Sequence, residues 1–415
     1  MRELLVRGGR PLSGGLEVEG AKNAALPIFC AALLTDAELI LRNIPELRDT
    51  LTILEMLEAL GKRVERLERD VYRITPGGEL KTEAPYEPVR RMRASFLVLG
   101  PMLARLGRAR VPLPGGCVLG PRPIDLHLKG LARMGAEISL SQGYVEARGR
   151  LHGAEVYLDY PSVGATEQLL LAAALVPEET VIHNPAAEPE VEDLARFLRE
   201  MGAEISWTPG EIRIRGRRVL AGVDYQIIPD RINAGTYLIA LAMSGGEGEI
   251  GCRPDHLQAL LGKLRECRIE VEEREGAVSV RSSGELRPVN LETGPYPGFP
   301  TDLQPQMTAL LCLAKGESLI RERVFPDRFG HVPELQRMGA RIELSDSVAI
   351  IKGVAHLEGA VVQAPDIRAG AALVLAGLVA RGETLIRDEG HLVRGYSDIV
   401  RDLRRLGAEI EWVRT

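Results

Sequence analysis

The stretch LREMGAEISW (198–207) decides the fold of this chain, because close variants of it recur along the sequence. Each variant reads as the end of an amphipathic helix, usually closed by glycine, that runs directly into a strand. The other copies are LEALGKRVER (57–66), LARMGAEISL (131–140), LRECRIEVEE (264–273), LQRMGARIEL (335–344) and LRRLGAEIEW (403–412). In chain order, the six copies begin 74, 67, 66, 71 and 68 residues apart. This near-constant spacing predicts six repeats of one structural unit.

A second helix is predicted before each copy. These segments are apolar nearly all round, so we expect buried helices, and they are too short to span a bilayer. They begin at Lys22, Arg93, Thr166, Arg231, Asp302 and Ile367. With the strands that alternate around the helices, each repeat is of a βαβαββ type and the fold class is α/β.

The last repeat predicts how the ends of the chain meet. It stops at Thr415 without the closing strands that follow the other five copies. The N-terminal stretch 4–23 matches 349–368 in pattern, so the N-terminal strands are expected to complete the sixth repeat. We therefore expect two domains of three repeats, 21–229 and 1–20 with 230–415. The chain crosses between them twice, which predicts an active site in a hinged interdomain cleft.

Composition excludes several classes of protein. Apolar residues make up 45% and charged residues 27% of the 415 residues, as in a soluble globular protein. The formal net charge of −6 argues against nucleic acid or a membrane as the main partner. Five scattered cysteines indicate a reducing, cytoplasmic compartment, and no motif predicts a metal site or a cofactor.

Charged residues recur at the loops that precede the helices. Equivalent loops of related repeats lie at the same end of a domain, so their cations are expected to gather there. The predicted set is Lys22, Arg93, Arg122, Arg231, Arg328, Arg368 and Arg394. Any one arginine is better explained as a capping or salt-bridging group on a solvated loop, but the whole set favours a site for phosphate and carboxylate groups.

An isolated cysteine adds chemistry to this prediction. Cys117 lies in the stretch PGGCVLGPRP (114–123), among glycines and prolines, with Arg122 five residues on. Cys30 and Cys312, by contrast, lie in apolar runs that are typical of structural cysteines. A thiol in a loop beside a cation is typical of a reactive residue.

These residues and several motifs together resemble a known family. The motifs are GAKNAALP (20–27), MRAS (92–95), PIDLH (123–127), SVGAT (162–166), EPE (188–190), PDR (229–231), FPTD (299–302), HVPEL (331–335), DIR (366–368) and RGY (394–396). Over essentially its whole length the chain resembles the UDP-N-acetylglucosamine 1-carboxyvinyltransferases, the enolpyruvyl transferases of peptidoglycan and cell-wall synthesis. The resemblance implies an inside-out α/β barrel in each domain. It also implies transfer of the enolpyruvyl group of phosphoenolpyruvate to the 3-hydroxyl of UDP-N-acetylglucosamine, with release of phosphate.

The resemblance also implies roles for residues. Cys117 is the expected acid, which also reacts covalently with phosphoenolpyruvate and with the inhibitor fosfomycin, and Asp302 is the expected base on the sugar hydroxyl. From its place at the head of a helix, Asp302 could also be an N-cap. Expected phosphoenolpyruvate ligands are Lys22, Asn23, Arg122, Arg328, Arg368 and Arg394, of which Lys22 and Arg394 count as catalytic. Expected UDP-sugar ligands are Asn23, Arg93, Pro123, Ile124, Asp125, Leu126, His127, Ser162, Val163, Gly164, Asp302 and Val324.

Two alternatives remain open from the sequence. The shikimate-pathway enolpyruvyl transferase shares the fold, but the Cys117 loop and the stretch 22–27 argue against it. A non-catalytic paralogue that only binds nucleotide sugars is the rival of another class. Retention of both Cys117 and Asp302 argues against that rival.

Overall fold

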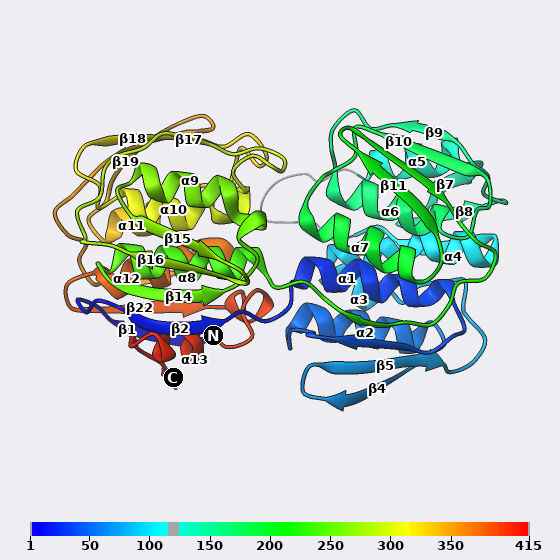
Figure 1. Cartoon of the computed structure of the whole chain (residues 1–415), viewed down its shortest axis with the longest axis horizontal. Coiled ribbons are helices and arrows are strands. Elements are labelled where there is room, and N and C mark those ends of the chain that lie inside the picture. Colours follow the sequence, from blue (N-terminus) through cyan, green and yellow to red (C-terminus); the bar gives the residue numbers. More distant parts are fainter. Residues whose placement is uncertain (1, 115–123, 414–415) are drawn as a thin grey trace. The chain divides into compact units, whose positions relative to one another are not determined.

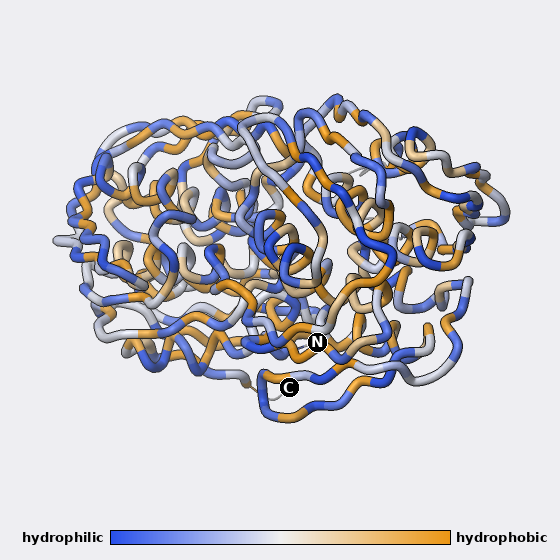
Figure 2. The backbone as a smooth tube through the Cα atoms, turned by 45° about the vertical axis from the view of Figure 1, so that its right-hand side comes forward, coloured by the Kyte–Doolittle hydropathy of each residue, from blue (hydrophilic) through white to orange (hydrophobic). Residues whose placement is uncertain are grey.

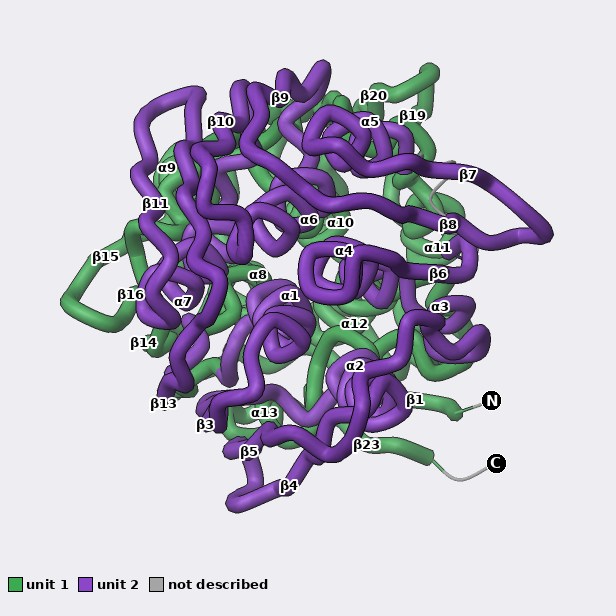
Figure 3. The backbone as a smooth tube through the Cα atoms, turned by 90° about the vertical axis from the view of Figure 1, so that its right-hand side faces the viewer, with its two compact units in different colours: residues 1–18, 118–120, 229–415 green, residues 19–117, 121–228 purple. Residues whose placement is uncertain are grey.

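The computed structural model describes residues 2–114 and 124–413, which divide into two compact units (Figures 1 and 3). Within these residues, unit 1 comprises 2–18 and 229–413, and unit 2 comprises 19–114 and 124–228. Each unit holds three of the predicted repeats and has its own hydrophobic core.

Unit 2 contains the first three repeats. The first has α1 (Lys22–Ala31), η1 (Ala32–Leu34), β3 (Leu39–Arg42), α2 (Arg48–Ala59), β4 (Lys62–Glu68) and β5 (Val71–Pro76). The second has α3 (Tyr86–Arg91), η2 (Arg93–Val98), α4 (Leu99–Leu106), β6 (Arg108–Pro112), α5 (Asp125–Arg133), β7 (Glu137–Ser141) and β8 (Tyr144–Arg148). The third has β9 (Glu155–Tyr157), α6 (Val163–Ala173), β10 (Glu179–His183), α7 (Pro189–Glu200), β11 (Glu204–Thr208) and β12 (Glu211–Arg215), and β13 (Asp224–Gln226) follows.

Unit 1 contains the N-terminal strands β1 (Arg2–Arg7) and β2 (Ser13–Glu17) and the last three repeats. The fourth repeat has α8 (Arg231–Met243), β14 (Glu247–Gly251), η3 (Pro254–Leu257), α9 (Gln258–Glu266), β15 (Glu270–Arg274) and β16 (Ala277–Arg281). The fifth has β17 (Leu291–Glu292), η4 (Thr301–Leu303), α10 (Gln304–Leu311), β18 (Glu317–Arg321), α11 (Val332–Arg337), β19 (Arg341–Ser345) and β20 (Val348–Lys352). The sixth has β21 (Val361–Gln363), α12 (Ile367–Val379), β22 (Glu383–Asp388), η5 (Leu392–Arg394), α13 (Ile399–Arg405) and β23 (Glu409–Val413).

Each repeat has a small sheet, and five of the six sheets in the described residues have four strands in the same order, whereas the sheet of the second repeat has only β6-β8-β7. In the third repeat the order is β9-β10-β12-β11, where β9 runs parallel to β10 and the other neighbours are antiparallel. The fifth repeat has the matching order β17-β18-β20-β19. Buried and more exposed positions alternate along strands such as β12 and β20, as the period of a strand requires, and Figure 2 shows hydrophobic and hydrophilic residues interspersed along the backbone.

The N-terminal strands join two different repeats. β1 lies between β22 and β23, with Leu5 opposite Leu385 and Glu411, so it supplies the closing strand of the sixth repeat as the sequence predicts. β2 instead runs parallel to β14 of the fourth repeat, with Leu16 opposite Ile250. β13, which precedes α8, runs parallel to β3 of the first repeat. Each strand that precedes a crossing thus pairs within its own unit. β2 joins a sheet of unit 1, and β13 joins a sheet of unit 2.

The predicted apolar helices form the interior of each unit. In unit 2, α1, α4 and α6 contact one another directly or through η1 and η2, and Figure 3 shows them inside the surrounding strands. In unit 1, α8, α10 and α12 pack together in the same way. Every residue of α12 from Arg368 to Leu378 is buried, which confirms that a helix apolar on all sides belongs to the core. Among the described residues, no helix has the length and apolar character needed to cross a bilayer.

Candidate functional site

In unit 1, the carboxylate of Asp302 lies between two arginines. Arg328 donates from Nη1 to Oδ1 of Asp302 at 2.6 Å, and Arg368 donates to Oδ2 from Nη2 at 3.0 Å and from Nε at 3.2 Å. Asp302 lies in η4, Arg328 follows β18, and Arg368 is in the first turn of α12. The Arg328 and Arg368 side chains are 6% and 5% exposed, against 24% for Asp302. The fold therefore holds two buried guanidinium groups around one accessible carboxylate.

The N-cap alternative for Asp302 is not what the structure shows. The N-cap residues of η4 and α10 are Pro300 and Leu303, and neither helix has a side-chain cap. The aspartates that do cap helices in unit 1 include Asp230 on α8 and Asp366 on α12, each accepting two backbone N–H bonds. Asp302 uses its carboxylate for the arginines instead.

The two arginines set the charge state of Asp302. Burial raises the pKa of the Asp302 carboxyl, but the charges of Arg368 and Arg328 and their hydrogen bonds outweigh burial and hold this pKa well below its usual range. Asp302 is therefore ionised at neutral and mildly acidic pH. A carboxylate stabilised in this way is a weak base as long as both guanidinium groups remain on it.

Other predicted cations of unit 1 lie beside aromatic rings or in short helices. The Arg368 guanidinium is 6.0 Å from the ring centroid of Tyr396, whose hydroxyl lies 2.9 Å from Oγ1 of Thr236. Arg231 begins α8 and lies over the ring of Tyr296 at 5.7 Å. Arg394 ends η5 and is partly buried. Arg231 and Arg368 thus lie in the first turns of helices, as the sequence predicts, and Arg394 lies in the segment before α13.

In unit 2, Lys22 also has a carboxylate partner. It is the first residue of α1, it is 8% exposed, and its Nζ lies 3.4 Å from Oδ2 of the buried Asp49. The neighbouring Asn23 is exposed. Asp49 was not among the residues that the sequence predicted for the site.

His127 lies near two other predicted residues of unit 2, Arg93 and Gly164. Its ring meets Phe96 edge-on, with centroids 5.7 Å apart. A Cβ added to Gly164 would lie 3.0 Å from Cε1 of His127, so the start of α6 touches this ring. Burial, and then the charge of Arg93, lower the pKa of His127 to about 4. Arg93, His127 and Gly164 therefore gather at one place, and the imidazole is neutral at neutral pH.

The start of α6 exposes backbone donors. Ser162 is the N-cap residue, and its Oγ accepts a bond from the N–H of Ala165 at 3.4 Å. Val163 and Gly164 begin the helix and are partly exposed. Amides in the first turn of a helix lack an intrahelical acceptor, so this terminus suits an anionic group.

The remaining predicted UDP-sugar residues lie at the start of α5 of unit 2, in a loop of unit 1, or outside the described residues. Ile124 is the N-cap residue of α5, Asp125 begins that helix and is exposed, and Leu126 packs against the core of unit 2. Val324 is partly buried in the loop after β18. Cys117, Arg122 and Pro123 lie outside the described residues, so their predicted roles have no structural counterpart here.

The other four cysteines have no reactive character. Cys30, Cys252, Cys267 and Cys312 are buried free thiols. Burial raises the pKa of Cys252, Cys267 and Cys312 to about 12, and that of Cys30 further still. A thiol that stays protonated is a poor nucleophile, so the described cysteines are structural. In the described part of the chain, no three His, Cys, Asp or Glu side chains are grouped as metal ligands.

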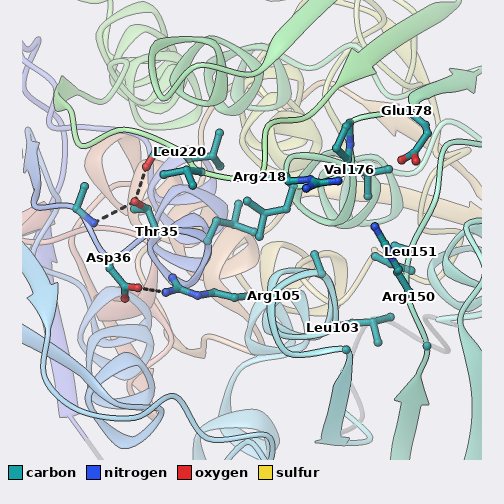
Figure 4. A pocket seen from close by; sticks show the side chains of 18 residues that line it. Thr35, Asp36, Leu103, Arg105, Arg150, Leu151, Val176, Glu178, Arg218 and Leu220 are labelled. Atoms are coloured by element: carbon teal, nitrogen blue, oxygen red, sulfur yellow. Dashed lines mark hydrogen bonds and ion pairs between the residues drawn. The ribbon is translucent and has the colours of Figure 1, made fainter.

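A cavity of about 700 Å³ in unit 2 lies away from all these residues (Figure 4). Its walls include Leu34, Leu103 and Leu175, which lie at or just beyond the C-terminal ends of α1, α4 and α6. Arg105 and Asp36 form an ion pair on its wall. The predicted ligands of unit 2 lie at the N-terminal ends of the same helix set, so this cavity is not the predicted site.

Three residues that contact predicted site residues, directly or through one neighbour, were missed by sequence reasoning, one in unit 2 and two in unit 1. Asp49 pairs with Lys22, Thr301 accepts a bond from Arg328, and the buried carboxylate of Glu322 accepts a bond from Thr301. Thr301 directly precedes Asp302, and Glu322 stands at the end of a strand, just before the loop that carries Arg328. Those positions were the available signals, but neighbourhood in sequence does not reveal which side chains meet.

Known proteins match the chain over nearly all its length. The sequence model of EPSP synthase (3-phosphoshikimate 1-carboxyvinyltransferase) matches residues 6–403. The chain belongs to this family. It is 50% identical over 416 residues to a UDP-N-acetylglucosamine 1-carboxyvinyltransferase of Granulibacter bethesdensis, covering 99% of each chain. It is 51% identical over 419 residues to UDP-N-acetylglucosamine 1-carboxyvinyltransferase 2 of Carboxydothermus hydrogenoformans, covering 100% of each.

Solved structures of enolpyruvyl transferases share the fold. The enolpyruvyl transferase NikO of Streptomyces tendae superposes with a TM-score of 0.91 at 28% identity, over 100% of this chain and 99% of that one. An EPSP synthase of Acinetobacter baumannii has a TM-score of 0.78 at 19% identity, covering 100% of both chains, which shows the fold alone. The predicted fold class, family and enzyme class, a transferase, are confirmed.

Proposed function

We propose that the chain transfers the enolpyruvyl group of phosphoenolpyruvate to the 3-hydroxyl of UDP-N-acetylglucosamine and releases phosphate, the first committed step of peptidoglycan synthesis. The observation that carries the proposal is the group of Asp302, Arg328 and Arg368, which offers two guanidinium groups to a substrate anion beside one carboxylate. Identity of about half over the full chain to relatives with that name supports the choice of substrates.

The reaction proceeds by addition and elimination. The methylene carbon of phosphoenolpyruvate gains a proton, while the sugar oxygen bonds to the adjacent carbon and its hydroxyl proton passes to a base. The resulting phospho-ketal then loses a proton from the new methyl group, and its carbon–oxygen bond to phosphate breaks. The chemistry needs an acid, a base and cations that hold the developing charges.

Asp302 is the proposed base, and substrate binding prepares it. In the free protein both guanidinium groups stabilise its carboxylate, which lowers its basicity. The carboxylate of phosphoenolpyruvate competes for Arg328 and Arg368. As those bonds are shared with the substrate, the pKa of Asp302 rises and the carboxylate becomes a better acceptor for the sugar hydroxyl proton.

The other predicted residues bind charges of the two substrates. Lys22, Arg122 and Arg394 hold the phosphate, and Asn23 holds the sugar or stabilises the intermediate. Ser162, Val163 and Gly164 at the start of α6 bind the diphosphate through helix amides. The remaining proposed nucleotide-sugar ligands are Arg93, Pro123, Ile124, Asp125, Leu126, His127 and Val324.

Release of phosphate tests the proposal. The chain is incubated with phosphoenolpyruvate and either UDP-N-acetylglucosamine or shikimate 3-phosphate, and inorganic phosphate is measured. We expect phosphate release when the acceptor is UDP-N-acetylglucosamine and none when it is shikimate 3-phosphate. Release with shikimate 3-phosphate instead would favour the shikimate-pathway activity. Binding of the UDP-sugar without release would favour the non-catalytic alternative.

Cys117 is the proposed acid and the site of covalent inhibition by fosfomycin. An aspartate at this position can still deliver a proton, but it forms no thioether. Cys117→Asp is therefore expected to keep measurable phosphate release and to resist inactivation by fosfomycin, which time-dependent activity loss reports. Cys252→Ser, which alters a buried thiol, is the matched control and stays sensitive. Inactivation of Cys117→Asp at the wild-type rate would contradict the assignment.

A further inference from the structure

Glu322 is a buried carboxylate that the proposed chemistry does not use. It is 1% exposed and follows β18 directly. Its Oε1 accepts bonds from Oγ1 of Thr293 at 2.7 Å and from the backbone N–H groups of Val324 at 2.8 Å and Phe325 at 3.0 Å. Its Oε2 accepts a bond from Oγ1 of Thr301 at 2.9 Å. Four donors from three segments of unit 1 therefore converge on this side chain.

The directions of the hydrogen bonds at Thr293 and Thr301 require that the Glu322 side chain accepts a bond from each hydroxyl. Oγ1 of Thr293 already accepts a bond from the N–H of Arg323 at 2.9 Å, and Oγ1 of Thr301 accepts one from Nη1 of Arg328 at 3.0 Å. Each hydroxyl hydrogen is thus available to Glu322. An ionised carboxylate only accepts hydrogen bonds, so it satisfies all four donors at once.

One oxygen of Glu322 leads directly to the candidate site. Thr301 bridges Glu322 and Arg328, and the same Nη1 of Arg328 donates to Asp302 at 2.6 Å. The other oxygen holds the backbone at Val324 and Phe325, and Arg328 donates its own N–H to the carbonyl oxygen of Phe325 at 2.9 Å. Both oxygens therefore act on the segment that carries Val324 and Arg328.

We propose that Glu322 is a positioning residue, which through Thr301 fixes the guanidinium of Arg328 for the carboxylate of phosphoenolpyruvate. The inference rests on the proposed function for the identity of that anion. Glu322 does not touch substrate; it holds the group that does. Preorganised donors of this kind lose binding energy when their support is removed, even though the donor itself remains.

Glu322→Gln isolates the connection to Thr301. An amide has one acceptor oxygen, and the three donors at Oε1 hold that oxygen, so the NH₂ group faces Thr301. The bond to Thr301 then reverses direction, so the Thr301 hydroxyl hydrogen loses its acceptor and no longer orients the oxygen that accepts from Arg328, while the loop keeps its three bonds. We expect the KM for phosphoenolpyruvate to rise about tenfold, the change expected from weakening one hydrogen bond to a charged group, with a smaller change in kcat.

A set of variants separates positioning from folding. Thr301→Val removes the bridging hydroxyl and is expected to raise the same KM by a similar factor. Thr301→Ser keeps the hydroxyl and the wild-type KM. The double variant Glu322→Gln with Thr301→Val is expected to be no worse than either single change, because both break one connection. Thr293→Val, which removes a donor from Oε1, is the control and is expected to lower the melting temperature without this rise in KM.

Two measurements distinguish this inference from the proposed function. Steady-state kinetics give KM and kcat, and calorimetric titration with phosphoenolpyruvate gives binding without turnover. Absence of turnover by the wild-type chain would contradict the proposed function. Equal affinity for phosphoenolpyruvate in the wild-type chain and Glu322→Gln would overturn this inference, as would a lower melting temperature with an unchanged KM.

Discussion

At the residue scale, Asp302 has two roles that require opposite properties: an ion-pair partner of low basicity and a proton acceptor. In the free protein its carboxylate forms ion pairs with the buried guanidinium groups of Arg328 and Arg368 and so offsets their positive charge. In the proposed reaction it must accept a proton. Because the arginines keep the pKa of Asp302 far below its usual range, binding of a second anion to them is what makes the carboxylate basic.

Asp302→Asn is predicted to separate turnover from binding. The amide accepts no proton from the sugar hydroxyl, so kcat is expected to fall about a hundredfold or more, the usual contribution of a general base. The amide also competes less strongly than a carboxylate for Arg328 and Arg368, so the affinity for phosphoenolpyruvate is expected to stay equal or to rise. Steady-state kinetics and calorimetric titration measure both quantities.

Asp327→Asn is the matched control for this prediction. Asp327 is an exposed aspartate beside Arg328 in sequence, and its backbone carbonyl oxygen accepts a bond from the N–H of Phe329. Wild-type kinetics are expected for it. A fall in affinity for phosphoenolpyruvate in Asp302→Asn, with kcat unchanged, would contradict the competition between Asp302 and the substrate anion.

At the element scale, most of the fold could be predicted because it repeats. The glycine that ends a helix and the strand after it are local features, and six copies of them reveal the unit. The buried helices were equally clear, since a helix apolar on all sides has one place in a soluble fold. The pairing of β2 with the fourth repeat and of β13 with the first repeat could not be predicted from the sequence, because short strands of similar pattern have several possible neighbours.

The candidate site could be predicted only in part, for a related reason. Lys22, Arg231 and Arg368 lie at helix starts, as repeat position predicts, because backbone geometry alone sets those places. The partners of these cations depend on how side chains pack between segments far apart in sequence. Asp302 meets Arg368 across 66 positions, and Thr301 meets Glu322 across 21. The spacing of the repeats does not determine these side-chain contacts.

At the scale of the whole molecule, a buried histidine ties stability to pH. His331 is fully buried at the start of α11, and neither ring nitrogen has a hydrogen-bond partner in the described part of the chain. Burial, and then the charge of Arg328, lower the pKa of His331 to about 3. An unfolded chain takes up this proton below about pH 6.5. Between about pH 6.5 and 3 the unfolded state binds more protons, so stability falls as the pH falls.

The His331→Gln variant is predicted to weaken this pH dependence. From pH 7.5 to 5.0, the wild-type free energy of unfolding should fall by about 2 kcal/mol more than that of the variant. Trp207 lies in unit 2 and Trp412 in unit 1, so a Trp207→Phe background lets urea unfolding of unit 1 be followed by fluorescence. His152→Gln, at an exposed histidine, is the control and should keep the wild-type dependence. Parallel pH curves for the wild type and His331→Gln would refute the assignment.

The proposed function requires this chain to make an enolpyruvyl ether on a UDP-sugar, with Asp302 as the base. Mass spectrometry of the acceptor after incubation with phosphoenolpyruvate tests it most directly. With the wild-type chain, we predict UDP-N-acetylglucosamine that has gained one enolpyruvyl group, in amounts equal to the phosphate released, and strongly reduced product with Asp302→Asn. An acceptor of unchanged mass, or full product from Asp302→Asn, would contradict the account.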